Sequence, residues 1–292
     1  MASGSKLRAR LAPYLFVAPN VLFFTTFVAV PAVYGFWLSL FTTSPYRPTR
    51  FVGLGNFEAL AHDDLFWRAV RNTVTFVVGD VALVVALAVA IGMLLNRSVR
   101  GRGFFRSAFF YPVLLSPVVV AIAWQWILNN RFGALNNALR WLGMRPVPWL
   151  LDASWAMTWV ILVHTWATVG FFALIVLAGL QSIPPVLYEA ASVDGATPLR
   201  RARHITLPLL APSVLTVLIL SLIHAFEIFD YVYVMTGGGP GFATLMMVQY
   251  IYRAGFELDQ FGLAAAGSLV LFVIILALTA LQFVMGRLVE AV

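Results

Sequence analysis

Long apolar runs, broken by short polar segments, dominate this chain of 292 residues. A bilayer core about 30 Å thick is crossed by about 20 helical residues. Six runs are long enough, and the spans are expected near residues 12–41, 70–95, 104–128, 155–180, 208–235 and 261–287. The first run is too long for the apolar core of a signal peptide, so we expect a retained span. The pattern predicts an all-α, polytopic membrane protein with six transmembrane helices.

Composition supports a membrane protein and excludes several kinds of chemistry. Hydrophobic residues make up 61% of the chain and charged residues 11%, outside the usual range for soluble domains. Cysteine is absent, which excludes disulfides, thiolate metal sites and cysteine nucleophiles. Lys6 is the only lysine, so a phosphate-binding loop ending in Gly-Lys-Ser/Thr cannot form. Any ATP-driven function therefore needs another chain, and we expect this one to be a non-catalytic subunit that binds no cofactor itself.

Positive charge is spread over the ends of the apolar runs. The net charge is +7, but scattered arginines do not make one basic face, so we expect no nucleic-acid partner. Of the 19 lysine and arginine residues, 11 lie in the N-terminus, the Asn96–Gly103 turn with Arg97, Arg100 and Arg102, the segment near 181–207 and the C-terminus, counting Arg106 at the end of a span. Such residues mark the cytoplasmic side of a membrane protein. Both termini and the 181–207 segment are therefore expected in the cytoplasm.

The most polar interior segment lies between the fourth and fifth apolar runs, at about 181–207. The two prolines at 184–185 suit a helix start, and Gly195 can adopt the positive φ that ends a helix of about two turns. A second short helix is expected over 198–204, running into Pro208, which opens the next span. We predict a water-exposed helix-turn-helix elbow that is rigidly joined to a membrane helix.

This segment resembles a known motif. Glu189-Ala190-Ala191, Gly195 and Ile205-x-Leu207-Pro208 match the EAA loop of type I ABC importer permeases, and the resemblance implies the fold of that family. In that family the loop is the coupling helix, which docks into a cleft on a cytoplasmic ATPase subunit. The residues that the resemblance assigns to ATPase coupling are Tyr188, Glu189, Ala190, Ala191, Asp194, Gly195 and Pro208. The chain has Ala202 where the family often has an aromatic residue. We expect this difference to affect how the second short helix packs.

Two external segments resemble the carbohydrate and glycerol-phosphate branch of the same family. Residues 51–57 match its "GLxNF" element, and Thr236-Gly237-Gly238-Gly239-Pro240 matches its "TGGGP" signature. No lysine follows these glycines, so we expect a tight backbone turn against a neighbouring subunit instead of a phosphate cradle. We expect Thr244, which follows the signature, to be reachable from outside. The predicted organisation is a first helix and external loop over 1–69 and a transporter core over 70–292.

The resemblance also implies an assembly. The chain would form half of a translocation pathway for a sugar or related polyol in the bacterial cytoplasmic (inner) membrane, as a multi-pass protein. Its implied partners are a second homologous permease subunit, two ATP-binding cassette subunits that hold ATP and Mg, and an extracytoplasmic solute-binding protein. Glycerol-3-phosphate or its diesters remain alternative cargoes. An ion-coupled secondary transporter using Asp80 or Glu227, or a membrane-embedded hydrolase, remains an alternative class, although neither a repeat nor a nucleophile with its base is evident.

Polar side chains inside the predicted spans are candidates for function because charge in hydrocarbon is costly. Asp80 is expected to pair with a polar group of a neighbouring helix. If the fifth span is one helix to residue 235, then one of its faces carries His224, Glu227 and Asp230 near the outer edge of the membrane. The substrate-path candidates are Trp159, His164, Trp166, His224, Glu227 and Asp230. A metal site is not expected, because the three or four matched ligands that it needs are missing.

Overall fold

The computed structural model describes residues 3–44, 47–96 and 101–290, almost all of the regular structure being helical. The turn that we expect to carry Arg97 and Arg100 lies outside the described residues. The chain divides into two compact units, Met1–Asp63 with Ile251–Leu271 and Asp64–Tyr250 with Phe272–Val292.

The first unit is a long helix followed by a small hairpin. Its elements in chain order are α1 (Ser3–Phe24), a π-helical turn η1 (Thr25–Ala29), α2 (Val30–Leu38), β1 (Phe41–Ser44), β2 (Arg47–Phe51), α3 (Gly55–Ala61), the π-helical turn η4 (Arg253–Glu257) and the start of α14 (Phe261–Glu290). The hairpin is antiparallel and pairs Phe41 with Phe51. The buried Asn56 amide donates to the backbone oxygens of Ser39 at 2.7 Å and Phe41 at 2.9 Å. In the "GLxNF" element the asparagine therefore ties the hairpin to α3.

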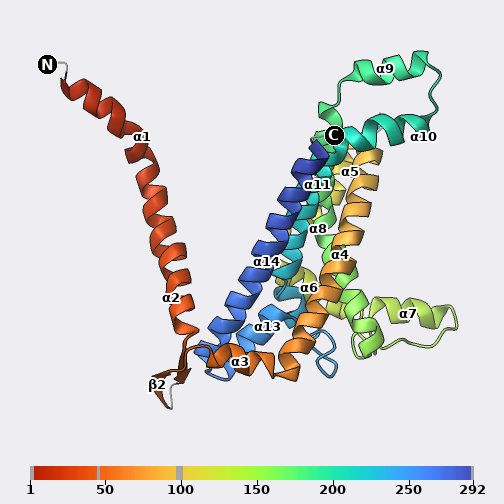
Figure 1. The fold of residues 1–292 in the computed structure, drawn as a ribbon. Coiled ribbons are helices and arrows are strands. Elements are labelled where there is room, and N and C mark those ends of the chain that lie inside the picture. The colour runs from red at the N-terminus through yellow and green to blue at the C-terminus, as the bar shows by residue number, and fades with distance from the viewer. Residues whose placement is uncertain (1–2, 45–46, 97–100, 291–292) are drawn as a thin grey trace. The chain divides into compact units, whose positions relative to one another are not determined.

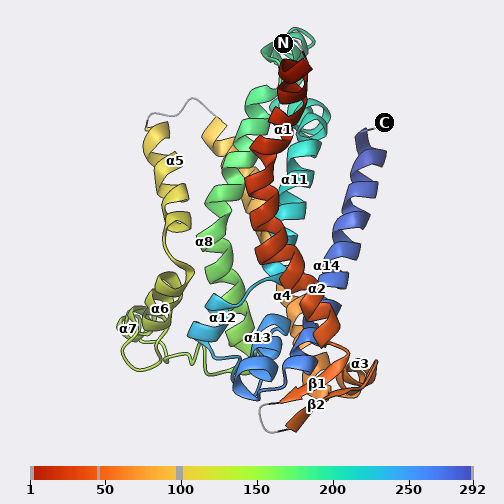
Figure 2. The ribbon, with the colours of Figure 1, turned by 90° about the vertical axis from the view of Figure 1, so that its left-hand side faces the viewer.

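The second unit is a bundle of long helices. Its elements in chain order are α4 (Asp64–Asn96), α5 (Arg102–Phe110), a 3-10 turn η2 (Tyr111–Leu114), α6 (Pro117–Ile127), α7 (Ala134–Trp141), α8 (Ala153–Ser182), α9 (Pro185–Val193), α10 (Pro198–Arg201), a π-helical turn η3 (Ala202–Thr206), α11 (Leu207–Phe226), α12 (Asp230–Met235) and α13 (Met247–Tyr252), and α14 ends in it. Helices α4 and α8 lie side by side (Figures 1 and 2). Small and branched side chains of α4, α8 and α11, among them Val84, Ala173 and Leu210, form the buried core.

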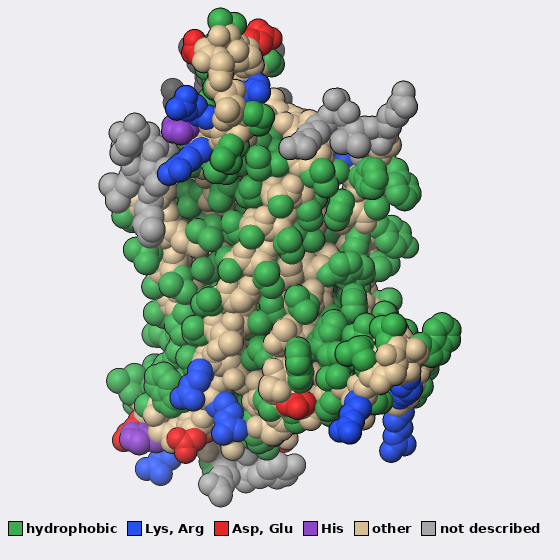
Figure 3. Space-filling view, turned by 90° about the vertical axis from the view of Figure 1, so that its right-hand side faces the viewer, with side chains coloured by type: hydrophobic (Ala, Val, Ile, Leu, Met, Phe, Trp, Pro, Cys, Tyr) green, Lys and Arg blue, Asp and Glu red, His purple; other side chains and the backbone are tan. Residues whose placement is uncertain are grey.

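Apolar side chains cover the middle of the face that Figure 3 shows. Figure 3 shows a broad hydrophobic band with charged side chains gathered at its two ends, the pattern of a protein that crosses a bilayer. The helices long and apolar enough to span are Pro13–Leu38, Asp64–Asn96, Ala153–Ser182, Pro198–Phe226 and Phe261–Val284. These agree with five of the six predicted runs, although the ends differ by several residues.

The predicted third span, 104–128, is not one straight helix. Its two halves, Gly103–Leu114 and Pro117–Ile127, are bent by 98° at a short break, so the described chain has five spans, or six if the bent pair counts as one. Ser116 is extended, with φ −59° and ψ 136°, and Pro117 begins the next helix. A residue before proline is pushed out of the helical region, because the proline ring crowds its backbone.

The predicted fifth span, 208–235, also ends early. Helix α11 stops at Phe226, Phe229 has the non-helical angles φ −135° and ψ −59°, and α12 begins at Asp230. The sequence carries no proline or glycine at this break. Gln125 of α6 donates to the backbone oxygen of Val234 at 3.1 Å, so a tertiary contact holds the end of the separate helix α12.

Candidate functional site

The predicted elbow at one end of the second unit is present (Figure 1). Helix α9 begins at Pro185 and ends at Val193, and Gly195 has φ +69°. The N–H groups of Gly195 and Ala196 donate to the oxygens of Ser192 and Ala191, which closes the helix end. A left-handed residue is needed here, and glycine adopts it without strain. The sequence-based prediction of this helix and its turn is confirmed.

The second arm of the elbow differs from the prediction. Thr197 caps α10 by accepting a hydrogen bond from the backbone N–H of Arg200. From Pro198 the helix runs through η3 and Pro208 to Phe226 without a break, so Pro208 does not open a new helix. Proline lacks an N–H, and the π-helical turn η3 just before it absorbs the irregularity. The elbow is therefore continuous with a membrane helix.

The two arms of the elbow are tied together. Tyr188 Oη lies 3.0 Å from Thr206 Oγ1, and the Arg201 guanidinium donates to Ser192 Oγ at 3.0 Å. Tyr188 also packs against the core that contains Leu210. These contacts join α9 to α10, to η3 and to the first turn of α11.

The remaining coupling candidates face outward. Glu189, Ala190, Asp194, Gly195 and Pro208 are exposed, while Ala191 is half-buried. Three large apolar side chains of the elbow also stand in the open, Val186, Val193 and Leu199, which are 62%, 88% and 79% exposed. An exposed apolar surface of this kind, beside charged groups, fits a protein docking site.

A polar cavity brings together four of the six substrate-path candidates. It has a volume of about 440 Å³ and is lined by His164 of α8, His224 of α11, Glu227 at the end of α11 and Asp230 at the start of α12. The sequence interpretation put His224, Glu227 and Asp230 on one helix face, and this is wrong because the helix ends between them. The break itself places both carboxylates at the same cavity.

Aromatic rings complete this cavity, and sequence reasoning found Phe229 beside Glu227 but missed the other three. Phe171 and Phe172 of α8, Phe229 and Tyr231 also line it. Tyr231 directly follows Asp230 in the sequence, and Phe171 lies seven residues, or about two helical turns, after His164, so helical spacing from the polar candidates is the signal that points to them.

Asp80 lies behind the cavity wall and is fully buried. Its Oδ1 accepts a hydrogen bond from Thr165 Oγ1 at 2.7 Å and lies 2.9 Å from His164 Nδ1. The rings of Phe76 and Tyr231 meet His164 edge-on, with centroids 5.4 and 5.3 Å away. The prediction that Asp80 pairs with a polar group of a neighbouring helix is confirmed.

The two tryptophan candidates lie elsewhere. Trp124 meets Trp166 with centroids 5.5 Å apart, and Trp149 meets Trp159 at 5.4 Å. Neither Trp159 nor Trp166 is among the residues that line the cavity. The structure thus separates an aromatic cluster from the polar cavity.

Comparisons with known proteins agree on one family. Residues 82–290 match the model of the binding-protein-dependent transport system inner membrane component. The chain is 36% identical to the trehalose/maltose transport system permease protein MalF of Thermococcus litoralis over 286 residues, 97% of each chain. It is also 36% identical to the sn-glycerol-3-phosphate transport system permease protein UgpA of Agrobacterium fabrum over 276 residues, 94% of each chain.

Solved structures give the same result. A chain of a bacterial ABC transporter involved in the import of the acidic polysaccharide alginate superposes with a TM-score of 0.86 at 26% identity, covering 97% of both chains. The exposed elbow, the polar cavity and these similarities agree: the chain belongs to the family of inner membrane components of binding-protein-dependent transport systems and is a permease subunit of an ABC importer.

Proposed function

We propose that the imported solute is a neutral sugar that passes through the cavity at His164, His224, Glu227 and Asp230. The observation that carries this proposal is the charge of the cavity wall: it has two carboxylates and, among the described residues, neither lysine nor arginine. Carboxylates accept hydrogen bonds from sugar hydroxyls and repel a phosphate or carboxylate of the solute. Phe171, Phe229 and Tyr231 supply apolar surface for the faces of a sugar ring.

Relatives of this chain differ in the charge of their solutes. One relative is named a trehalose/maltose transport protein, and another is named an sn-glycerol-3-phosphate transport protein. The solved transporter is involved in the import of the acidic polysaccharide alginate. The wall described above favours the first kind over the other two.

The chain supplies half of a pathway in the proposed assembly. A second permease supplies the other half, two ATP-binding cassette subunits bind ATP and Mg, and an extracytoplasmic binding protein delivers the sugar. In the bacterial inner membrane both termini and the α9–α10 elbow face the cytoplasm, and the bent pair α5–α6 makes the sixth crossing. The transporter core begins at about residue 70.

The elbow is the proposed ATPase contact. Glu189 and the exposed apolar side chains of α9 and α10 dock into an ATPase subunit, and the Tyr188–Thr206 and Ser192–Arg201 bonds transmit its movement to α11. Because α11 ends at the cavity, this movement reaches Glu227.

The test is ligand-dependent ATP hydrolysis by the purified complex in lipid nanodiscs. Its binding protein is added with maltose, trehalose, sn-glycerol-3-phosphate or an alginate oligosaccharide. We expect a neutral sugar to stimulate hydrolysis and the two anionic solutes not to. Stimulation by an anionic solute alone would overturn the neutral-sugar proposal.

A further inference from the structure

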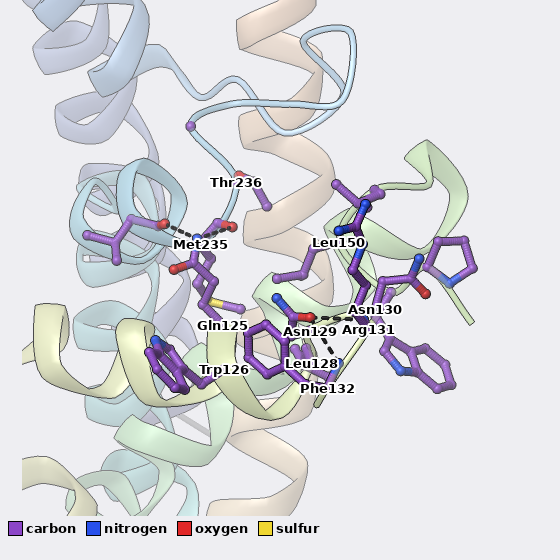
Figure 4. A pocket seen from close by; sticks show the side chains of 15 residues that line it. Gln125, Trp126, Leu128, Asn129, Asn130, Arg131, Phe132, Leu150, Met235 and Thr236 are labelled. Atoms are coloured by element: carbon purple, nitrogen blue, oxygen red, sulfur yellow. Dashed lines mark hydrogen bonds between the residues drawn. The ribbon is translucent and has the colours of Figure 1, made fainter. Parts of the chain in front are cut away.

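A second hollow lies at the end of the second unit opposite the elbow, and it has a different chemistry. It has a volume of about 820 Å³ and is formed by the end of α6, the loop over 128–132, residues 148–151 and the end of α12 with Thr236 and Gly237 (Figure 4). Under the proposed topology this end faces the outside. The hollow shares no lining residue with the cavity that contains Glu227.

The loop over 128–132 is held in one conformation by its own side chains. Asn129 Oδ1 accepts hydrogen bonds from the backbone N–H groups of Arg131 at 2.9 Å and Phe132 at 3.3 Å (Figure 4). Gly133 follows, and a Cβ there would collide with the backbone oxygen of Asn129.

Two residues of α7 hold the same loop from behind. Asn136 is fully buried, and its amide group bonds both the oxygen and the N–H of Val147 at 2.9 Å and the oxygen of Asn130 at 3.3 Å. The Arg140 guanidinium donates to the oxygens of Asn130 at 3.2 Å and Arg131 at 2.7 Å. A loop tied at so many points is preorganised, and binding to it costs little ordering entropy.

The end of α6 and this loop present two aromatic rings and one arginine to solvent. Trp126 is 64% exposed and Phe132 56%, and their rings meet edge-on. Arg131 is exposed, and in the described part of the chain its guanidinium forms no ion pair or hydrogen bond. Tryptophan and arginine are the residues that most often carry binding energy at protein interfaces.

Charge indicates what the hollow receives. Its lining includes Arg131 and no aspartate or glutamate. The adjacent Asp152 caps α8, and hydrogen bonds from the hydroxyl and backbone N–H of Ser154 lower the pKa of the Asp152 carboxyl. Asp152 is thus engaged by Ser154, and the Arg131 guanidinium is available to a carboxylate that the occupant brings.

We infer that this hollow is a docking site for the extracytoplasmic binding protein and receives a surface loop that carries an aspartate or glutamate beside an apolar side chain. The carboxylate pairs with Arg131, and the apolar side chain packs on Trp126 and Phe132. This inference rests on the proposed function for its partner, the binding protein, and for the topology that places the hollow outside, and it is independent of which sugar is carried.

The test is a charge reversal measured on the whole complex. ATP hydrolysis by nanodisc-reconstituted complexes is followed as purified binding protein is titrated in. For Arg131→Glu we expect the half-maximal binding-protein concentration to rise at least about tenfold. Basal hydrolysis is expected to stay at the wild-type level, because the Arg131 side chain is exposed and touches neither the elbow nor the core. Trp126→Ala is expected to raise the same concentration by a smaller factor.

Arg145→Glu is the matched control. Arg145 is exposed on the same external segment and does not line the hollow, so this variant makes the same charge change nearby. An equal rise in both variants would show long-range attraction instead of docking and would overturn the inference. Wild-type titration curves for Arg131→Glu and Trp126→Ala would overturn it as well. If wild-type complex itself ignores the binding protein, the proposed function fails, and the docking site fails with it.

Discussion

At the scale of single residues, the wall of the polar cavity depends on Asp80, which bonds the lining residue His164 but does not itself line the cavity. Asp80 is fully buried, and its Oδ2 has no hydrogen-bond partner in the described part of the chain. The polar contacts of its carboxyl group are therefore those of Oδ1 with His164 and Thr165. Breaking a buried pair on one side leaves the other partner uncompensated.

Asp80→Ala is therefore expected to destabilise the subunit by about 1–3 kcal/mol, because it leaves the buried His164 and Thr165 groups without their acceptor. Thr165→Val removes one hydrogen bond to the same oxygen and should cost only about 1 kcal/mol. Thermal unfolding of the purified subunit complex measures both. Equal stability of the Asp80→Ala variant and wild type would show that the pair does not hold α4 and α8 together.

Glu227 is exposed to the cavity and is expected to act on transport instead of stability. Glu227→Gln keeps the shape and most hydrogen-bonding capacity and should reduce uptake of the stimulating sugar only partly. Glu227→Ala should reduce it severely, with the amount of assembled complex unchanged. Sugar uptake by cells that carry each variant, normalised to the amount of the permease in the membrane, measures both effects. Wild-type uptake in both variants would place Glu227 outside the substrate path.

At the scale of elements, the elbow depends on one backbone conformation. Gly195 has φ +69°, and a Cβ there would meet nothing within 4 Å. A substitution of Gly195 would therefore act through the backbone conformation and not through a steric clash. A residue with a side chain is less stable in the left-handed conformation by about 1–2 kcal/mol.

Gly195→Val should abolish binding-protein-stimulated ATP hydrolysis while the subunit still reaches the membrane, because valine cannot hold the turn that aims α9. Gly195→Asn is the control, since asparagine tolerates this conformation and should keep most of the stimulation. Hydrolysis and membrane insertion are measured on the same preparations. Full stimulation in the valine variant would contradict coupling through this turn.

At the scale of the whole molecule, the structure changes how topology is tested. We expected Thr244 to be reachable from outside, and this is wrong: Thr244 is fully buried and its hydroxyl bonds Gly239 O at 2.7 Å and Thr236 Oγ1 at 2.8 Å. The signature loop folds over its own threonines. The tight turn that was predicted for the glycines is present, with positive φ at Gly237 and Gly238.

Val193 and Arg145 are better positions for testing the topology by cysteine labelling. Both are exposed, and the elements that carry them, α9 and the segment after α7, lie at opposite ends of the second unit. In membranes that contain the subunit without the ATPase subunits proposed to cover α9, Val193→Cys should react with impermeant thiol reagents only from the cytoplasmic side, and Arg145→Cys only from outside. The chain has no native cysteine to confuse the labelling. Thr244→Cys should stay unlabelled until the protein is denatured. The reverse pattern for the first two would invert the proposed topology.

Properties that depend on neighbouring residues could be predicted from the sequence alone. Hydropathy predicted the apolar helices, and two prolines and one glycine predicted α9 and its turn. Both signals are local, because solvation and the allowed backbone angles of a residue depend on that residue and its near neighbours in the sequence. The bend before Pro117 has the same kind of local signal, because proline disfavours the helical conformation of the residue before it.

Other features were decided only by the tertiary structure. The end of α11 at Phe226 has no local signal and coincides with contacts from α6 to the following helix. The bond between Asp80 and His164 joins residues 84 positions apart, and the separation of Trp159 and Trp166 from the Glu227 cavity depends on the rotation of α8. Such contacts follow from how helices pack against each other, and a pattern read along one helix contains no information about the face that its neighbour presents.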